Sequence, residues 1–275
     1  MKTTPPAPAD LALLPESNRR RFARNLGLAA AVAGGSALLQ ACGGSSTAPV
    51  LPVISGPSGG LSDADYLNFA LNLAYLEAEF YAFATTGKGI DAKLQGTPSG
   101  TTTNGAQVAF TDPAVQAIAV ELAADELAHV TLLRGLLGSA AVGKPAIDLN
   151  ALKSGFGSDA EFLTLARAFE DVAVSAYAGS AEFLLASNSI ATAVLLLGGE
   201  SEHAGNLRLA IVEKGITVTP LDASDVVPTA TTYFSADASG LAVRRTTRQV
   251  LNIVYGGTGA SGLFFPSGFN GKIVS

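Results

Sequence analysis

Two copies of the pattern Glu-x-x-His place a carboxylate and an imidazole where both could bind one metal ion. Glu126 pairs in this way with His129, and Glu200 with His203, each pair within an apolar run of helical periodicity. Residues three apart on an α-helix differ by about 60° around the axis and about 4.5 Å along it. The two side chains of each pair therefore project from one face. The 275-residue chain has only two histidines, and both fall in this pattern.

Two further glutamates complete a ligand set, because each lies alone in another apolar helical run. Four carboxylates converging in an apolar core would repel one another, and unpaired buried charge is costly. Two divalent cations would neutralise them. We therefore expect a two-metal site inside a bundle of four helices. Its predicted ligands are Glu77, Glu126, His129, Glu170, Glu200 and His203. A ligand set of four carboxylates and two imidazoles is rich in oxygen, which favours iron or manganese over zinc. These ligand types do not distinguish iron from manganese.

Other acidic residues of these runs do not share the ligand face. Glu79 follows Glu77 by two residues, and Glu202 follows Glu200 by two, so each points roughly 160° away from its neighbour. We interpret both as exterior. Four more glutamates on the presumed outer faces are assigned to solvent: Glu121, Glu161, Glu182 and Glu213.

Two tyrosines lie near the predicted ligand face. Tyr81 is one helical turn from Glu77, and Tyr177 is two turns from Glu170. Such phenols could hold the ligands by hydrogen bonds or take part in redox chemistry. The alternative for both is ordinary core packing of an amphipathic helix.

The overall composition indicates a substantial core and excludes some classes of function. Hydrophobic residues make up 48% of the chain, and mean hydropathy is positive at +0.35. Much of this content is Ala, Leu and Val, with the first two among the good helix formers. The net charge of −6 is opposite to the basic footprint of a nucleic-acid-binding protein. The single cysteine excludes an internal disulfide framework.

The N-terminal segment has the pattern of an export signal. Residues 18–24, with Arg19 and Arg20 before Phe22, resemble a twin-arginine motif, and an apolar stretch follows over residues 26–41. Residues 38–42 resemble a bacterial lipobox ending at Cys42. We expect a signal peptide over 1–41, lipidation of Cys42, and a flexible Gly/Ser/Pro-rich tether over 42–60. The mature protein would then be a lipoprotein of the periplasm or cell envelope. The alternatives are a cleaved signal with an incidental cysteine, or an N-terminal anchor helix.

The remaining chain divides into helical runs and polar connections. Capping residues and glycines predict four long helices, at about 62–87, 112–137, 159–185 and 190–214. Residues 91–111 are predicted to be a loop that could hold a short hairpin, 139–157 a long crossover, and 187–189 a short turn. A linker over 216–236 leads to a fifth helix at 237–255 carrying Arg244, Arg245 and Arg248. The glycine-rich tail should pack on the bundle through Phe264, Phe265 and Phe269.

With these residues in place, the chain resembles the ferritin-like superfamily. The likeness rests on residues 71–81, on both Glu-x-x-His motifs, on residues 168–177, and on the tail around 254–271. Within that superfamily it resembles the group of desiccation-related, or ferritin-like-domain, proteins. This implies an all-α fold: a ferritin-like four-helix bundle over 61–215, followed by a C-terminal helix and tail over 216–275 packed on it.

The resemblance and the ligand set lead to two hypotheses about function. The first is an oxidoreductase with two iron or manganese ions, which oxidises ferrous iron or removes peroxide in envelope stress protection. Glu126 and Glu200 would bridge the metals, and the other four ligands would be terminal. The second is a non-catalytic stress or desiccation-related scaffold that binds metal structurally or not at all. Expected partners are metal ions and oxygen or peroxide, with no nucleic acid and only a lipid anchor to the membrane. The oligomeric state is left open.

Overall fold

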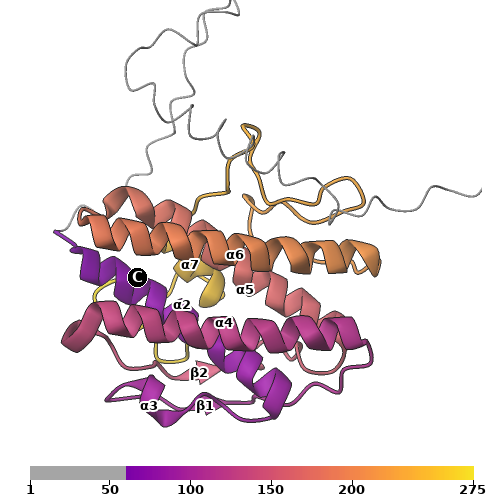
Figure 1. Cartoon of the computed structure of the whole chain (residues 1–275), viewed down its shortest axis with the longest axis horizontal. Helices are drawn as coiled ribbons and strands as arrows, with labels where there is room; N and C mark the ends of the chain where they lie inside the picture. The colour runs from indigo at the N-terminus through magenta and orange to yellow at the C-terminus, as the bar shows by residue number, and fades with distance from the viewer. Residues whose placement is uncertain (1–59) are drawn as a thin grey trace, which may run out of the picture. The chain divides into compact units, whose positions relative to one another are not determined.

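Four long helices form the body of the protein. A computed structural model describes residues 60–275, and the predicted signal, tether and Cys42 lie outside this part of the chain. The bundle helices are α2 (Asp63–Thr86), α4 (Pro113–Leu137), α5 (Asp159–Ser180) and α6 (Ser187–Glu213). Helix α2 packs along α4 and also against α5, and α5 packs along α6. Helices α4 and α6 run side by side, but their backbones approach each other closely at far fewer positions (Figure 1). The prediction of an all-α, ferritin-like bundle is confirmed.

The helix ends follow the local signals in the sequence. Ser62 and Asp65 form a capping box at the start of α2, and Gly87 ends this helix in a left-handed conformation. Asp112 caps α4 by accepting a hydrogen bond from the Ala114 amide. Within the described residues, no helix combines the length and the apolar character that crossing a membrane requires.

Two long loops are joined by a small parallel sheet. The loop between α2 and α4 contains a short helix, α3 (Ala92–Gln95), and strand β1 (Thr102–Thr103). Strand β1 pairs in parallel with β2 (Ile147–Asp148), which lies in the crossover between α4 and α5. The expectation of a local hairpin over 91–111 is therefore wrong. The partner strand comes from a segment distant in the sequence, which local patterns do not reveal.

These loops cover the face of α2 to which Glu79 points. Glu79 is 1% exposed, and its Oε1 lies 3.2 Å from Nζ of the equally buried Lys144. Its Oε2 accepts a hydrogen bond from the Ile90 amide. The interpretation of Glu79 as exterior is wrong, because a helix face turned away from the metal ligands is not necessarily turned toward solvent. Glu202 is exposed, as expected.

The connection between α5 and α6 is earlier than predicted. A single turn of 3₁₀-helix, η3 (Ala181–Phe183), follows α5, and α6 already begins at Ser187. The turn therefore lies over 184–186 rather than 187–189. The amides of Leu185 and Ala186 donate to the carboxylate of Asp63 at the start of α2. This contact with a distant helix fixes the turn.

The fifth helix is shorter than predicted. Helix α7 spans only Thr247–Val254, and Arg245 precedes it. The Arg245 guanidinium is buried, where it donates to both carboxylate oxygens of Asp222 and to the Ser175 hydroxyl. The Arg245 amide also donates to the Ser175 carbonyl of α5. The backbone amide and the guanidinium of Arg245 are therefore hydrogen-bonded to α5 and to the linker, and the chain at Arg245 does not continue the helix.

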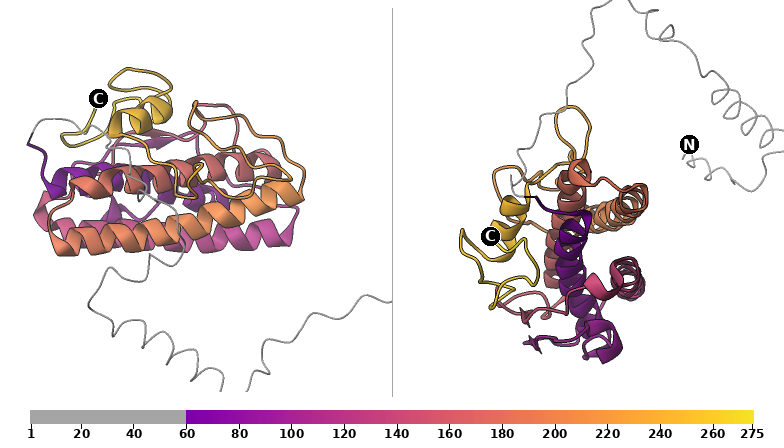
Figure 2. Two further views of the ribbon diagram at one scale, coloured as in Figure 1. Left: turned by 90° about the horizontal axis from the view of Figure 1, so that it is seen from above. Right: turned by 90° about the vertical axis from the view of Figure 1, so that its left-hand side faces the viewer.

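The C-terminal tail lies on the side of the bundle formed by α2 and α5, opposite α4 and α6 (Figure 2). Phe264, Phe265 and Phe269 are buried, as predicted. Two hydrogen bonds of 2.9 Å join Asn270 to Asn72 of α2. The backbone N–H of Asn270 donates to the Asn72 side-chain oxygen, and the Asn72 side-chain nitrogen donates to the backbone carbonyl of Asn270. The tail is therefore an integral part of the fold.

Candidate metal centre

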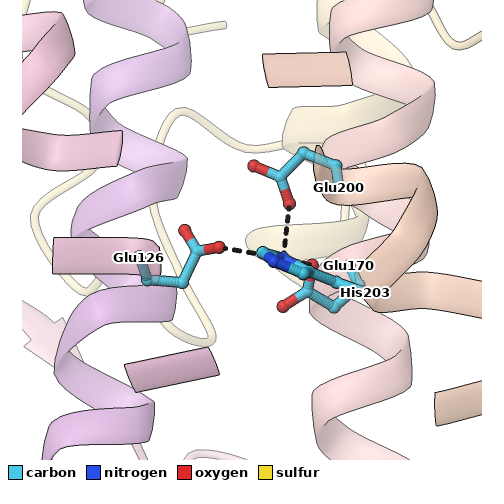
Figure 3. Close-up of side chains that lie close together, drawn as sticks. All are labelled: Glu126, Glu170, Glu200 and His203. Carbon is cyan, nitrogen blue, oxygen red and sulfur yellow. Dashed lines mark hydrogen bonds and ion pairs between the residues drawn. The ribbon is translucent and has the colours of Figure 1, made fainter. Parts of the chain in front are cut away.

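The six predicted ligands come from all four helices of the bundle. Glu77 lies on α2, Glu126 and His129 on α4, Glu170 on α5, and Glu200 and His203 on α6. The four glutamates are at most 2% exposed. Ligand atoms of four residues lie within 4.8 Å of one another, a spacing that fits a shared metal site (Figure 3). These four residues are Glu126, Glu170, Glu200 and His203.

Glu126 and Glu200 lie between the two imidazoles. Glu126 Oε1 is 3.0 Å from His129 Nδ1 and 3.3 Å from His203 Nδ1. Glu200 Oε1 is 3.2 Å from His129 Nδ1, and its Oε2 is 3.9 Å from His203 Nδ1. Each of these carboxylates therefore faces both histidines. Of the two histidines, Glu170 contacts His203, with its Oε2 3.2 Å from Nδ1 of that ring.

Short distances in the centre do not amount to a complete hydrogen-bond network. Both carboxylate oxygens of Glu126, both of Glu200, and Nδ1 of His129 are buried without a hydrogen bond of acceptable geometry. Nearly all buried polar atoms in folded proteins have such a partner, and leaving one without it is costly. Five such atoms gathered in one place fit the donor set of a metal site, since they are O and N donors that iron and manganese accept.

The charges of the centre shift its pKa values in a consistent way. Burial, together with the negative charges of Glu200, Glu126 and Glu170, raises the pKa of Glu77 well above its ordinary value. Burial and the charges of Glu126 and Glu170 do the same to the pKa of Glu200. Burial also acts to raise the pKa of Glu126, but its contacts with His129 and His203 outweigh this and lower it. The metal-free site therefore disfavours the ionised forms of Glu77 and Glu200, and divalent cations would supply the positive charge that stabilises those forms.

Neighbouring carboxylates raise the pKa values of the two histidines, although these side chains are largely buried. Burial by itself lowers the pKa of an imidazole, but contact with Glu126 and Glu200 raises that of His129 to about 10. Contact with Glu126 and Glu170 likewise raises the pKa of His203 to about 11. Without metal, both rings therefore carry protons that partly offset the carboxylate charge. Metal binding would have to displace these protons, because a coordinating imidazole nitrogen must be unprotonated.

Glu77 and the two tyrosines surround this cluster. Glu77 is buried and near enough for the charges of the other three glutamates to act on its pKa, although it is not one of the four residues within 4.8 Å. The Tyr81 hydroxyl donates to Glu170 Oε1 at 2.5 Å. Tyr177 is buried, and burial together with the charges of the glutamates raises the pKa of its phenol well above the ordinary value. Tyr81 therefore holds a predicted ligand directly.

Asp125 is a residue of the centre that the sequence analysis missed. Its Oδ2 lies 3.3 Å from Nε2 of His203, the ring nitrogen that faces away from the cluster. A carboxylate in this place fixes the orientation of a metal-binding imidazole and increases its basicity. Asp125 directly precedes Glu126 in the sequence, but the histidine that it contacts is on another helix. Only the packing of α4 beside α6 brings them together.

Comparisons with known proteins agree with this architecture. The model of the ferritin-like domain family matches residues 62–213, which contain all six predicted ligands. The chain is 26% identical to the ferritin-like catalase Nec2 of Nesocodon mauritianus over 266 residues, covering 78% of this chain and 85% of the relative. It is 34% identical to the desiccation-related protein PCC13-62 of Craterostigma plantagineum over 127 residues, covering 46% of this chain and 38% of that relative. Fold, family match and relatives together show that this chain belongs to the ferritin-like domain family.

Proposed function

We propose that the protein binds two iron or manganese ions in the bundle and uses them to remove hydrogen peroxide. One observation carries this proposal. Five buried atoms that could bind metal, the carboxylate oxygens of Glu126 and Glu200 and Nδ1 of His129, make no hydrogen bond. Glu126 and Glu200 face both histidines and would bridge the two metals. Glu77, His129, Glu170 and His203 would be terminal ligands.

The chemistry of peroxide removal explains the choice of metals. When bound, a pair of redox-active ions supplies and accepts the two electrons by which two hydrogen peroxide molecules become two waters and one dioxygen. A relative is named a ferritin-like catalase, which supports this reaction over others. Ferrous iron oxidation is the alternative chemistry for the same ligands.

The protein's own residues would position the ligands and limit what reaches them. Tyr81 holds Glu170 by its hydrogen bond, and Asp125 contacts the outer nitrogen of His203. The four glutamates are shielded from solvent, so small reactants such as peroxide would reach them more readily than bulky ones. The buried Tyr81 phenol keeps its proton, because burial and the charges of Glu170 and Glu77 raise its pKa well above the usual value. It therefore continues to donate to Glu170 over the physiological pH range.

Elemental analysis followed by two activity assays tests the proposal. Full-length protein, processed by its host, is expected to contain up to two iron or manganese ions per chain and to release dioxygen from hydrogen peroxide. Ferrous oxidation without dioxygen release would support the alternative chemistry. Metal without either activity would support a scaffold role, of the kind suggested by the likeness to a desiccation-related protein. Protein prepared with added iron and manganese that retains neither would refute the metal centre.

We further propose that the protein acts in the cell envelope. The support is the sequence of residues 18–42, with its arginine pair, apolar stretch and Cys42. Twin-arginine export carries folded proteins, so metal could be loaded before export. Several acyl chains on a lipoprotein would hold it firmly, whereas one chain gives only marginal attachment.

A further inference from the structure

A pocket of about 260 Å³ lies between α4 and α6, on the outer side of the metal centre. It occurs where these two helices have the least contact among neighbouring helices of the bundle. The residues that matter for its chemistry are Glu121, Asp125 and His129 of α4, and Gly199, Glu202 and His203 of α6.

The two imidazoles separate this pocket from the buried carboxylates. The side chains of His129 and His203 are 14% and 11% exposed, whereas those of Glu126 and Glu200 are at most 1% exposed. The nitrogens Nδ1 of both rings face the carboxylates. The pocket therefore leads to the histidine side of the ligand cluster, and an ion passing the rings would arrive among the donor atoms.

Gly199 is the position on α6 at which a side chain would meet this path. A Cβ atom there would lie 3.4 Å from Nε2 of His129, an ordinary van der Waals contact. A methyl group would therefore fit, but a larger side chain would extend over the ring. Adjacent Gly198 differs, because a Cβ atom there would meet nothing within 4 Å. Both glycines lie in the same helix, so they form a matched pair.

The charge of the pocket indicates what passes through it. Glu121, Asp125 and Glu202 contribute three carboxylates, and no lysine or arginine lines the pocket. His129 and His203, protonated in the metal-free protein, offset two of these three charges, so the pocket keeps an excess of negative charge. A concave site with an excess of one sign of charge concentrates ions of the opposite sign and repels ions of the same sign. Cations are therefore favoured over anions at this side of the centre.

We propose that this pocket is the entrance through which divalent cations reach the ligand cluster, and that Gly199 keeps it open. The proposal rests on the proposed function, since it requires that the cluster binds metal. It assigns to Gly199 a role in the rate of metal exchange, and none in the affinity of the loaded site.

Cobalt(II) uptake by metal-free full-length protein tests the entrance, because visible absorption reports Co²⁺ bound to nitrogen and oxygen ligands. We expect Gly199→Leu to slow uptake by about tenfold or more, the change that an added barrier of about 1.4 kcal/mol produces. Gly199→Ala and Gly198→Leu should take up Co²⁺ at the parent rate. The double variant Glu121→Gln with Glu202→Gln should slow uptake, with a loss of the parent's dependence on salt.

Release of Co²⁺ to a chelator separates a blocked entrance from a damaged site. Gly199→Leu protein that is refolded in the presence of Co²⁺ should release it more slowly than the parent, by a factor similar to that for uptake. Faster release would mean that the substitution had disturbed the ligands, and would overturn the proposal. Uptake by Gly199→Leu at the parent rate would also overturn it, while leaving the metal centre intact. A parent protein that binds no Co²⁺, Fe²⁺ or Mn²⁺ would refute the proposed function itself.

Discussion

Tyr81 of α2 donates a 2.5 Å hydrogen bond to Glu170 of α5, so that two helices of the bundle are joined at a predicted metal ligand. This contact is buried at both ends. Its position means that the phenol orients one carboxylate oxygen, while the other lies 3.2 Å from His203.

Tyr81→Phe should weaken metal binding without unfolding the protein. The substitution keeps the ring and removes the hydrogen bond to Glu170. Loss of a contact that orients a metal ligand typically lowers affinity by about 10- to 100-fold. Competition with a chelator measures this change. Tyr66→Phe is the control, since Tyr66 is also a buried tyrosine of α2 but stacks on Phe183. Equal affinities for parent and Tyr81→Phe would show that Tyr81 serves only in packing.

The double variant His129→Ala with His203→Ala should lose most of its metal. Each substitution removes a nitrogen donor that no neighbouring carboxylate can replace in position. Elemental analysis of purified protein measures the loss. Asn206→Ala, an exposed position beside the same pocket, should keep the parent content. If the double variant also kept it, the metal would have to be bound elsewhere.

The metal-free protein should lose thermal stability as the pH rises from about 6.5 to 10. In the unfolded chain the histidines titrate near 6.5, whereas in the folded protein the pKa is about 10 for His129 and about 11 for His203. In this window the folded state binds more protons than the unfolded state, so the free energy of unfolding falls with pH. The raised pKa values of Glu77 and Glu200 act in the same direction.

Calorimetry of metal-free and Mn²⁺-loaded protein checks this pH dependence. Metal binds the unprotonated ligands, so the stabilisation gained from Mn²⁺ should increase with pH over the same window. A melting temperature of the metal-free protein that rises from pH 6.5 to 9.5 would contradict the assigned protonation of the two histidines.

Gly179→Ala should destabilise the protein, because a Cβ atom there would overlap the carbonyl oxygen of Arg245. Overpacking of this kind typically costs about 1–3 kcal/mol. Gly205→Ala is the matched change on α6, where the new methyl group meets nothing within 4 Å. It should stabilise the helix by about 0.5–1 kcal/mol. Urea denaturation of both variants measures the difference, and similar midpoints would refute the close approach of the Arg245 segment to α5.

Replacing Arg19 and Arg20 by lysine should block export, and Cys42→Ala should release soluble protein or leave an uncleaved precursor. The reason is that the arginine pair is the expected recognition element and the cysteine thiol the expected site of acylation. Cell fractionation followed by mass analysis checks both variants. The same processed, membrane-bound form in Cys42→Ala and parent would rule out lipidation at this residue.

The sequence by itself determined the four bundle helices and the direction of their ligands. Helical periodicity is local, so the phase of Glu126 and His129, or of Glu200 and His203, follows from spacing alone. The caps at Ser62 and Asp112 are local as well. The burial of the phenylalanines in the tail could also be expected, since apolar side chains gain free energy on leaving water.

Tertiary structure decided what covers each helix and which side chains meet across helices. Glu79 is buried because Lys144, 65 residues later, folds over it, and no pattern around Glu79 records this. Arg245 lies outside helix α7 because its partners, the half-buried Asp222 and the buried Ser175, are fixed on other segments. Asp125 meets His203, and Gly199 meets His129, only through the packing of α4 beside α6. These contacts depend on the whole fold, because their free energy is gained only when distant segments are already in place.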